Sequence, residues 1–300
     1  MRGGSRANLT RFTSDRLPLS VILATVEPWP DLANCLEALA PQVAAVGGEI
    51  IIGDGHGSAL DASRAAESPV LSCVRVPGAS VFELRARAVE RARGEIIALT
   101  EDHCLVGRDW CRQILQVFST ERDVMGVTGP VLNGSTDRLI DCANFLHTFA
   151  SCVPPVNRAQ RERCPPPANV AFRRSAIGPG PIRAGRIELE ISPRLFREGL
   201  FHVHDGITVT HVQSHGFWLT LRAHFDNGRS TTGLHRVPLT RRQLPWSLLS
   251  GALRSMSAEA RRTPVVRSSI PLMFLLSCCH AAGEVAGIVA GPGSSPTRLR

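Results

Sequence analysis

Three apolar runs of the sequence end in polar residues that could bind a ligand. The first ends at Thr25-Val26-Glu27, the next at Gly53-Asp54-Gly55-His56-Gly57, and a later one at Thr100-Glu101-Asp102-His103. Parallel α/β sheets bind ligands at the carboxyl ends of their strands, where these residues would lie. The glycines around Asp54 let backbone approach a ligand closely, and the carboxylate can accept hydrogen bonds from a base or a ribose. This is the outline of a nucleotide pocket, although each acid taken alone also suits a loop turn or a helix cap.

Strands and helices alternate along the chain before these residues and between them. Apolar runs predict strands over 19–25, 49–52, 71–76 and 95–100. Helical spacing predicts one helix that starts near Leu32 and stops at Pro41, and another over 82–93. Further along we expect strands around Val127 and Val170, a helix over 189–198, and a mobile surface loop over 152–167. This order predicts βαβ units in an α/β layer.

Composition excludes several kinds of chemistry. The chain has 300 residues and a formal net charge of +8, and its 34 basic residues are all Arg because it contains no Lys; Tyr is absent too. No mechanism can therefore use a Schiff-base lysine or a phenolic acid. Nine Cys without a C-x-x-C pair fit neither a disulfide framework nor a zinc ribbon, so we interpret them as reduced thiols. Few aromatic residues and no stacking platform argue against a nucleic-acid partner.

The stretch from Ile270 to Ala290 is nearly long enough to span a membrane, which takes about 20 apolar residues. Glu284 and His280 interrupt it, because a carboxylate near the middle of a membrane costs about 2.5–3.5 kcal/mol. A helix that lies in the interface or packs on a partner fits as well as a span. Arg residues upstream would meet anionic lipid headgroups or form an ordinary solvated face: Arg254, Arg261, Arg262 and Arg267. With no secretory signal visible, we expect the cytoplasmic face of the cell membrane, with peripheral attachment or a single C-terminal anchor.

The order of these segments resembles that of the inverting family-2 glycosyltransferases with the GT-A fold. The resemblance runs from Leu19 to His211, and RARGEIIALTEDHC is its most specific part. The other matching stretches are LSVILATVEPWPDLANCLEAL, EIIIGDGHGS, GPV, ANVAFRR and ELEISPRLFREGL. The resemblance implies an α/β fold of the GT-A type (nucleotide-diphospho-sugar transferase-like), with a mixed, mostly parallel sheet flanked by helices. The chain would divide into a flexible basic N-terminal tail (1–17), a GT-A domain (18–215) and a C-terminal helical, basic and apolar membrane-associated region (216–300).

The same resemblance implies transfer of a sugar, with inversion, from a nucleoside-diphosphate sugar to a hydroxyl acceptor in cell-envelope or lipid-linked glycan synthesis. Donor binding would fall to Thr25, Glu27, Asp54, Arg85, Glu101, Asp102 and Asn169. The triplet Glu101-Asp102-His103 stands in the place of the family's metal-binding D-x-D, so Glu101, His103 and His211 would hold a divalent cation, Mn²⁺ or Mg²⁺. Such an ion offsets the charge of a departing diphosphate. Imidazole at position 103 suits Mn²⁺ better than Mg²⁺.

Inversion needs one carboxylate that takes the proton of the acceptor hydroxyl. The family places this base just before a helix, and the resemblance aligns Glu188 with it and leaves Glu190 as the second choice. Both residues also suit the N-terminus of a helix dipole without any catalytic role. Arg173 and Arg174 are candidates for phosphate contacts or for solvated surface positions, and we expect Cys104 to be a packing residue.

Two other functions stay open. The departures from the family pattern at His103, Glu188 and Pro193 fit a catalytically lapsed relative that binds a nucleotide or an assembly partner. A metal-dependent hydrolase is the third reading, with a centre built from His202, His204, His211, His215 and Glu188. No H-E-x-x-H motif accompanies these histidines. Tightly held stoichiometric zinc would indicate the hydrolase, and weak Mn²⁺ or Mg²⁺ dependence the transferase.

Overall fold

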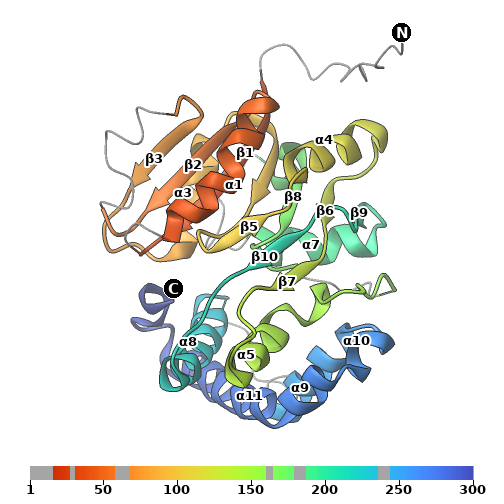
Figure 1. Cartoon of the computed structure of the whole chain (residues 1–300). Coiled ribbons are helices and arrows are strands. Elements are labelled where there is room, and N and C mark those ends of the chain that lie inside the picture. The colour runs from red at the N-terminus through yellow and green to blue at the C-terminus, as the bar shows by residue number, and fades with distance from the viewer. Residues whose placement is uncertain are drawn as a thin grey trace.

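A mostly parallel sheet forms the centre of the upper half of the molecule in Figure 1. The computed structural model describes residues 16–27, 31–57, 68–159, 165–178, 187–235 and 244–299. Within them, seven strands lie in the order β3-β2-β1-β4-β8-β6-β9. They are β1 (Leu17–Thr25), β2 (Glu49–Asp54), β3 (Leu71–Arg75), β4 (Gly94–Leu99), β6 (Gly126–Thr128), β8 (Val170–Arg173) and β9 (Phe201–Val203). Only β8 runs antiparallel to its neighbours in this sheet.

Helices cover both faces of the sheet, which explains the unbroken apolar runs of its strands. Leu19, Val21 and Leu23 of β1 pack toward α1 (Asp31–Ala45) and α4 (Trp110–Thr120). Ile22, between them, packs on the opposite face toward α3 (Val81–Arg91) and α7 (Ile187–Arg197). Because successive side chains of a strand point to opposite faces, one run fills two core layers.

The predicted elements are present, with one correction in the first helix. Helix α1 does not stop at Pro41 but continues to Ala45. Leu39 and Val43, on either side of the proline, are fully buried, and this packing offsets the hydrogen bond that proline cannot donate. The Gln42 side chain also donates to the carbonyl oxygens of Ala38 and Gly107. Part of the predicted loop 152–167 lies outside the described residues, so its mobility stays a prediction.

A second, three-stranded sheet lies beside the first and carries one of the candidate histidines. It consists of β5 (Cys104–Val106), β10 (Val209–His211) and β7 (Val131–Asn133), in the order β5-β10-β7. Strand β10 runs antiparallel to β5, with His211 opposite Cys104. This register brings His211 next to the residues that follow β4, although more than 100 positions separate them in the sequence.

Helices form the lower half of the molecule (Figure 1). They are α5 (Leu139–Phe149), α8 (Phe217–His235), α9 (Pro245–Ser255), α10 (Ala258–Arg262) and α11 (Pro264–Ala290); a short α6 (Arg174–Ile177) follows β8, and the 3-10 helices are η1 (Ala150–Cys152) and η4 (Ser295–Arg298). Helix α11 packs very closely on α8. A Cβ atom added to Gly283 would lie 2.0 Å from the Phe225 carbonyl oxygen, so only glycine fits at this position. The predicted division of the chain at residue 216 stays a prediction.

Helix α11 is long and apolar enough to cross a membrane by length and composition, with a mean hydropathy of 1.7 in its most apolar window. Of that window, 39% is buried against the rest of the protein. Glu284 is among the buried residues, and the backbone carbonyl of His280 lies against Gly228 of α8. The two polar residues that interrupt the apolar run therefore belong to the buried side of the helix.

Candidate active site

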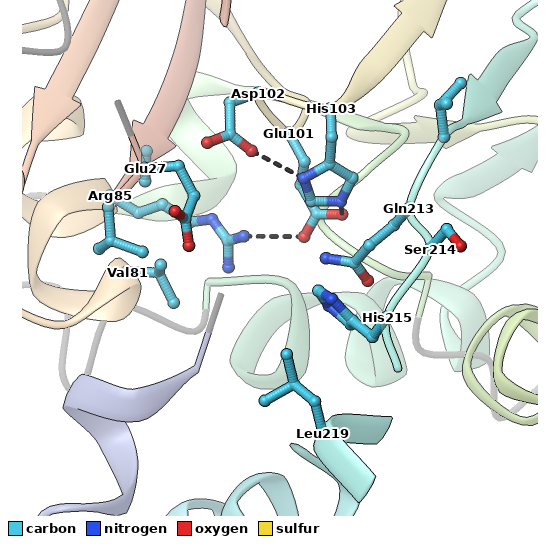
Figure 2. A pocket seen from close by; sticks show the side chains of 13 residues that line it. Glu27, Val81, Arg85, Glu101, Asp102, His103, Gln213, Ser214, His215 and Leu219 are labelled. Carbon is cyan, nitrogen blue, oxygen red and sulfur yellow. Dashed lines mark hydrogen bonds and ion pairs between the residues drawn. The ribbon is translucent and has the colours of Figure 1, made fainter. Parts of the chain in front are cut away.

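The candidate site lies at the end of β1, where the chain connections leave toward opposite sides of the sheet. From β1 the chain continues to β2 on one side, whereas β4 pairs with β1 on the other side. Ligands bind at such a switch point because the loops that leave the two strands separate there. A cavity of about 390 Å³ opens at this place, and Figure 2 shows the side chains around it. Its walls come from residues 24, 26 and 27, from helix α3, from residues 101–103 and 212–215, and from Leu219.

The three predicted metal ligands, Glu101, His103 and His211, lie close together beside this cavity. The Nε2 atoms of His103 and His211 face each other at 2.9 Å. Glu101 Oε2 lies 3.6 Å from Nε2 of His103 and 3.7 Å from Nε2 of His211. Donor atoms that surround one ion at about 2.1 Å are about 3.0–3.4 Å apart, so the three atoms fit a single cation with small adjustments. The residues present therefore suit a divalent ion with two imidazole ligands and one carboxylate ligand.

Asp102 orients one of these imidazoles rather than adding a fourth ligand. Its Oδ1 lies 2.7 Å from Nδ1 of His103, on the side of the ring away from His211. A carboxylate at Nδ1 fixes the proton there and leaves the lone pair of Nε2 for a metal. Burial alone would raise the pKa of Asp102, but hydrogen bonds from His103 and Thr25 and the charges of His103 and Arg85 lower it below its ordinary value.

The two histidines of the cluster differ in their electrostatics. Burial would lower the pKa of His103, but the hydrogen bond to Asp102 and the negative charges of Glu101 and Asp102 outweigh burial and raise it. Burial, together with the charges of His103 and His215, lowers the pKa of His211 well below its usual value. Of the two rings, His211 is therefore the harder one to protonate.

Cys104 also lies in the cluster, since its Sγ is within 4.8 Å of the other three ligand atoms. The thiol is fully buried, and burial, with the charge of Glu101, raises its pKa well above the ordinary value. A cation that bound the sulfur would itself deprotonate the thiol, so Cys104 is a possible fourth ligand of the cluster, and its role as a packing residue stays a prediction.

Arg85 supplies a positive charge beside the cluster. It is buried on α3, and its Nη2 lies 3.0 Å from Glu101 Oε1, the oxygen that faces away from the histidines. The preceding residue, Leu84, packs so closely on β2 that a Cβ atom on Gly53 or Gly55 would lie 2.8–2.9 Å from Leu84 atoms. The sequence suggested that these two glycines let a ligand approach the backbone, but the group that lies close to them is Leu84 of helix α3. Their effect on the site is indirect, because they set the position of Arg85.

A second cavity of about 330 Å³ adjoins the first and shares the side chains of Arg85, Glu101 and His103. Glu188, in the first turn of α7, lines it and is only 4% exposed. Glu190 is exposed and does not line either cavity. Glu188 thus lines the same cavity as Glu101, His103 and His211, whereas Glu190 lies outside both cavities.

The predicted donor-binding residues separate into lining and supporting residues. Glu27, Arg85, Glu101 and Asp102 line the first cavity. Thr25 lies just behind it, buried, and its hydroxyl donates to the Glu27 carbonyl oxygen. Asp54 pairs with Thr25 at the end of β2, is fully buried, and accepts a hydrogen bond of 2.7 Å from the Gly57 amide. A role for Asp54 in base recognition stays a prediction, because residues 58–67 beside it lie outside the described part of the chain.

Asn169, which was predicted to contact the donor sugar or the acceptor, has its polar groups engaged within the protein. It is fully buried and lines neither cavity. Its Nδ2 donates to the carbonyl oxygens of Pro130 and Ile207, and its Oδ1 accepts from the Trp110 indole. Because these partners occupy both ends of the amide, Asn169 joins the two sheets and leaves no group for a ligand.

Arg173 and Arg174 do not serve as phosphate contacts either. Arg173 donates to the carbonyl oxygens of Phe118 and Val124, and Arg174 donates to those of Ala92 and Gly94. Gly94 begins β4, so Arg174 lies at the end of that strand opposite to the site. A lone Arg-Arg pair at the end of a strand carries no sequence signal that separates backbone capping from ligand binding.

The hydrolytic centre proposed as an alternative does not assemble. His202 forms a surface ion pair with Glu121, and His204 accepts a hydrogen bond from the Gly206 amide. Neither residue lines a cavity with Glu188, although His211 and His215 do. The spacing of His202 and His204 reflects a half-exposed edge strand.

Sequence reasoning missed Gln213 and Ser214, which follow His211, and considered His215 only for the hydrolytic centre. Gln213, Ser214 and His215 form one wall of the first cavity (Figure 2). Arg138 holds this segment by donating to Ser214 Oγ and to the His215 carbonyl oxygen, and it also pairs with Asp141. The signal was the position of these polar residues directly after a strand end. The second cavity adds Asn144 and His224, which lie far from every motif in the sequence.

Comparisons with known proteins bear on the fold. No protein-family model matches the sequence, and no curated protein matches it either. Among solved structures, this chain is similar to the mannosyltransferase PcManGT from Pyrobaculum calidifontis in complex with GDP-Man and Mn²⁺. The TM-score is 0.55 at 17% identity, over 90% of this chain and 87% of that one. The chain shares the fold of this mannosyltransferase. The predicted α/β fold class is thereby confirmed.

Two further solved structures are less similar to this chain. A mycobacterial protein has a TM-score of 0.49 at 14% identity, over 75% of this chain and 76% of that one. S. aureus TarS 1-349 has a TM-score of 0.45 at 11% identity, over 90% of each chain.

Proposed function

We propose that this protein is a metal-dependent glycosyltransferase that moves a sugar, with inversion, from a nucleoside-diphosphate sugar to a hydroxyl acceptor. The observation that carries the proposal is the convergence of Glu101, His103 and His211 between two adjoining cavities, with Glu188 in the second. The similar PcManGT structure holds GDP-Man and Mn²⁺, which supports a nucleotide-sugar donor and favours Mn²⁺ over Mg²⁺ here. We further propose that the reaction serves cell-envelope or lipid-linked glycan synthesis.

Each side chain has a task in this reaction. The bound cation would supply positive charge to the diphosphate leaving group. Arg85 adds a second, buried positive charge in the same cavity, and Asp102 keeps the His103 ring in place. Glu188 takes the proton of the acceptor hydroxyl as that oxygen attacks the anomeric carbon and the bond to the diphosphate breaks. Because Glu188 is buried beside the cluster, it can reach a reacting hydroxyl without competition from bulk water.

Calorimetric titration with UDP, GDP, dTDP and CDP, with and without Mn²⁺, tests donor binding. We expect at least one nucleotide to bind, and to bind more tightly with Mn²⁺. His211→Ala should abolish the metal dependence, whereas His202→Ala, which removes a surface ion pair, should preserve it. Metal-independent binding of every nucleotide, or no binding at all, would contradict the proposal.

Substitution of Glu188 tests the chemical step and separates a working enzyme from a catalytically lapsed relative. We expect Glu188→Gln to lower turnover by at least about 100-fold, the usual contribution of a general base, while donor affinity is retained. Glu190→Gln is the matched control, since Glu190 lies on the same helix but is exposed. Release of nucleoside diphosphate from the donor measures both. Full activity of Glu188→Gln would contradict the assignment of Glu188 as the base. If the wild type releases no nucleoside diphosphate with any donor, metal or acceptor, the result would support a catalytically lapsed relative.

We also propose that the protein attaches peripherally to an anionic membrane on its cytoplasmic face through α11. From residue 268 to residue 290, Glu284 is the only charged residue, and it is buried. The exposed side of the same stretch carries Leu275, Val285 and Val289. Exposed Trp246 packs against Phe274 of α11, as a residue suited to the membrane interface. Arg261 and Arg262 at the end of α10, and Arg267 in the first turn of α11, are all exposed and would meet anionic headgroups.

Sedimentation with phospholipid vesicles tests the attachment. The protein should bind vesicles that contain phosphatidylglycerol more strongly than vesicles of phosphatidylcholine alone. The double variant Arg262→Glu/Arg267→Glu should weaken binding, whereas Arg122→Glu, exposed after α4, should not. Equal binding to both kinds of vesicle, or to neither, would contradict the proposal.

A further inference from the structure

The second cavity extends from the candidate active site to the helices of the lower half. At one end lie Glu101, His211 and Glu188. The far wall comes from α5 and α8 and consists of Asn144, Thr148, Ala223, His224 and Asn227. No carboxylate or guanidinium belongs to this wall within the described residues that line the cavity. A ligand that reaches Glu188 from this side therefore meets amide, hydroxyl and imidazole groups.

Asn144 and His224 form a fixed pair in this wall. Nε2 of His224 donates to Oδ1 of Asn144 at 2.9 Å, and the His224 residue is only 5% exposed. Burial, with the neighbouring His147 and His280, lowers the pKa of His224 well below its usual value, so the ring is neutral. Because the Asn144 carbonyl oxygen is engaged by the ring, its Nδ2 group remains as a donor. Nδ2 makes no hydrogen bond within the described part of the chain.

We propose that Asn144, oriented by His224, donates a hydrogen bond to the sugar acceptor, and that the acceptor is an uncharged polyhydroxylated glycan end. This inference rests on the proposed transferase function and deepens it. An amide N–H recognises a hydroxyl oxygen. The charged side chains that line this cavity, Arg85, Glu101 and Glu188, lie at its other end and are assigned to the diphosphate, the cation and the proton transfer. On the wall that carries Asn144, an ammonium group would find no carboxylate, and a phosphate or carboxylate would find no guanidinium. Leu189, Pro166 and Leu299 also line the cavity and offer apolar contact to the C–H face of a sugar ring. Asn144 is therefore a positioning residue for the acceptor, and Glu188 remains the base.

Binding of simple sugars to the full chain tests the inference. The probes are the methyl glycosides of glucose, galactose, mannose and N-acetylglucosamine, added to protein saturated with Mn²⁺ and the nucleoside diphosphate that binds best. Saturation-transfer NMR measures glycoside binding, and calorimetry measures nucleotide binding in the same variants. We expect at least one glycoside to bind, and Asn144→Ala and the isosteric Asn144→Asp to weaken it about three- to tenfold, the effect of one neutral hydrogen bond. Nucleotide affinity and melting temperature should not change, and Gln116→Ala, exposed on α4, should change neither binding.

The possible outcomes distinguish this inference from the proposed function. If the nucleotide binds but no methyl glycoside does, the inference fails and the proposed function stands. The inference fails in the same way if both Asn144 variants, correctly folded, bind the glycoside as the wild type does. Preference for glucosamine or glucuronate over the neutral glycosides would overturn the assigned acceptor class. If neither nucleotide nor glycoside binds, the proposed function fails, and this inference fails with it.

Discussion

Replacing Asp102 with Asn would remove the charge that fixes the His103 ring while preserving the shape of the side chain. In the wild type, Oδ1 of Asp102 lies 2.7 Å from Nδ1 of His103, and the carboxylate is buried. The amide that replaces it can turn its NH₂ group toward Nδ1, which places the ring proton on Nε2, the atom that faces His211. A protonated Nε2 cannot bind a cation. Residues that orient metal ligands typically contribute 10- to 100-fold in metal affinity, which corresponds to about 1.4–2.7 kcal/mol.

Electron paramagnetic resonance of free Mn²⁺ measures the expected loss directly, since the ion loses its sharp solution signal when it binds. The dissociation constant for Mn²⁺ should rise at least tenfold in Asp102→Asn, and His103→Ala should raise it further. Asp109→Asn is the matched control, because Asp109 forms an exposed pair with Arg112. Circular dichroism confirms that each variant is folded. A folded Asp102→Asn protein that binds Mn²⁺ within twofold of the wild type would refute the orienting role of Asp102.

Two further predictions concern stability. Gly283→Ala should lower the melting temperature by at least about 5 °C, because its Cβ would collide with the Phe225 carbonyl oxygen and push α11 from α8. Gly251→Ala, in α9 with nothing within 4 Å, should leave the melting temperature unchanged or raise it, and equal effects of the two would contradict the close packing. Acid should also destabilise the protein: burial lowers the pKa of His147 from 6.5 to about 3, so the unfolded chain takes up this proton first as the pH falls. Stability is fully present above pH 6.5 and falls by about 2 kcal/mol from this group by pH 5. Thermal melts at pH 6.5 and pH 5 should show a smaller loss of stability in His147→Gln than in the wild type. His204→Gln, on the surface, is the control. An equal loss of stability in His147→Gln and the wild type would show that His147 is not responsible.

The strands and much of the cluster could be predicted from the sequence because both depend on local pattern. A run such as LSVILAT can be buried on both faces only in a covered sheet, so β1 and its neighbours follow from composition and length. Glu101, Asp102 and His103 lie directly after a strand, and the switch-point rule places such residues at a ligand site. The family resemblance added His211 and Glu188, which spacing alone did not connect to the triplet.

The sequence could not assign residues whose type suits both ligand binding and internal packing. A buried amide such as Asn169 looks the same in sequence whether it binds a sugar or, as here, joins Trp110 to two carbonyl oxygens. The glycines at 53 and 55 could equally have admitted a ligand, but they admit Leu84. In each case the partner comes from a distant segment, and no local signal identifies it.

Neighbouring residues encode the sheet, the Glu101-Asp102-His103 triplet at its edge and the apolar C-terminal helix, so these features could be predicted before the fold was known. Packing between distant segments sets three other features: His211 faces His103, Glu284 is buried while α11 keeps an apolar outer side, and Asn144 and His224 form a wall of the second cavity. These facts depend on the pairing of β10 with β5 and on the packing of α5, α8 and α11. Such contacts between distant segments are settled by the packing of the whole chain.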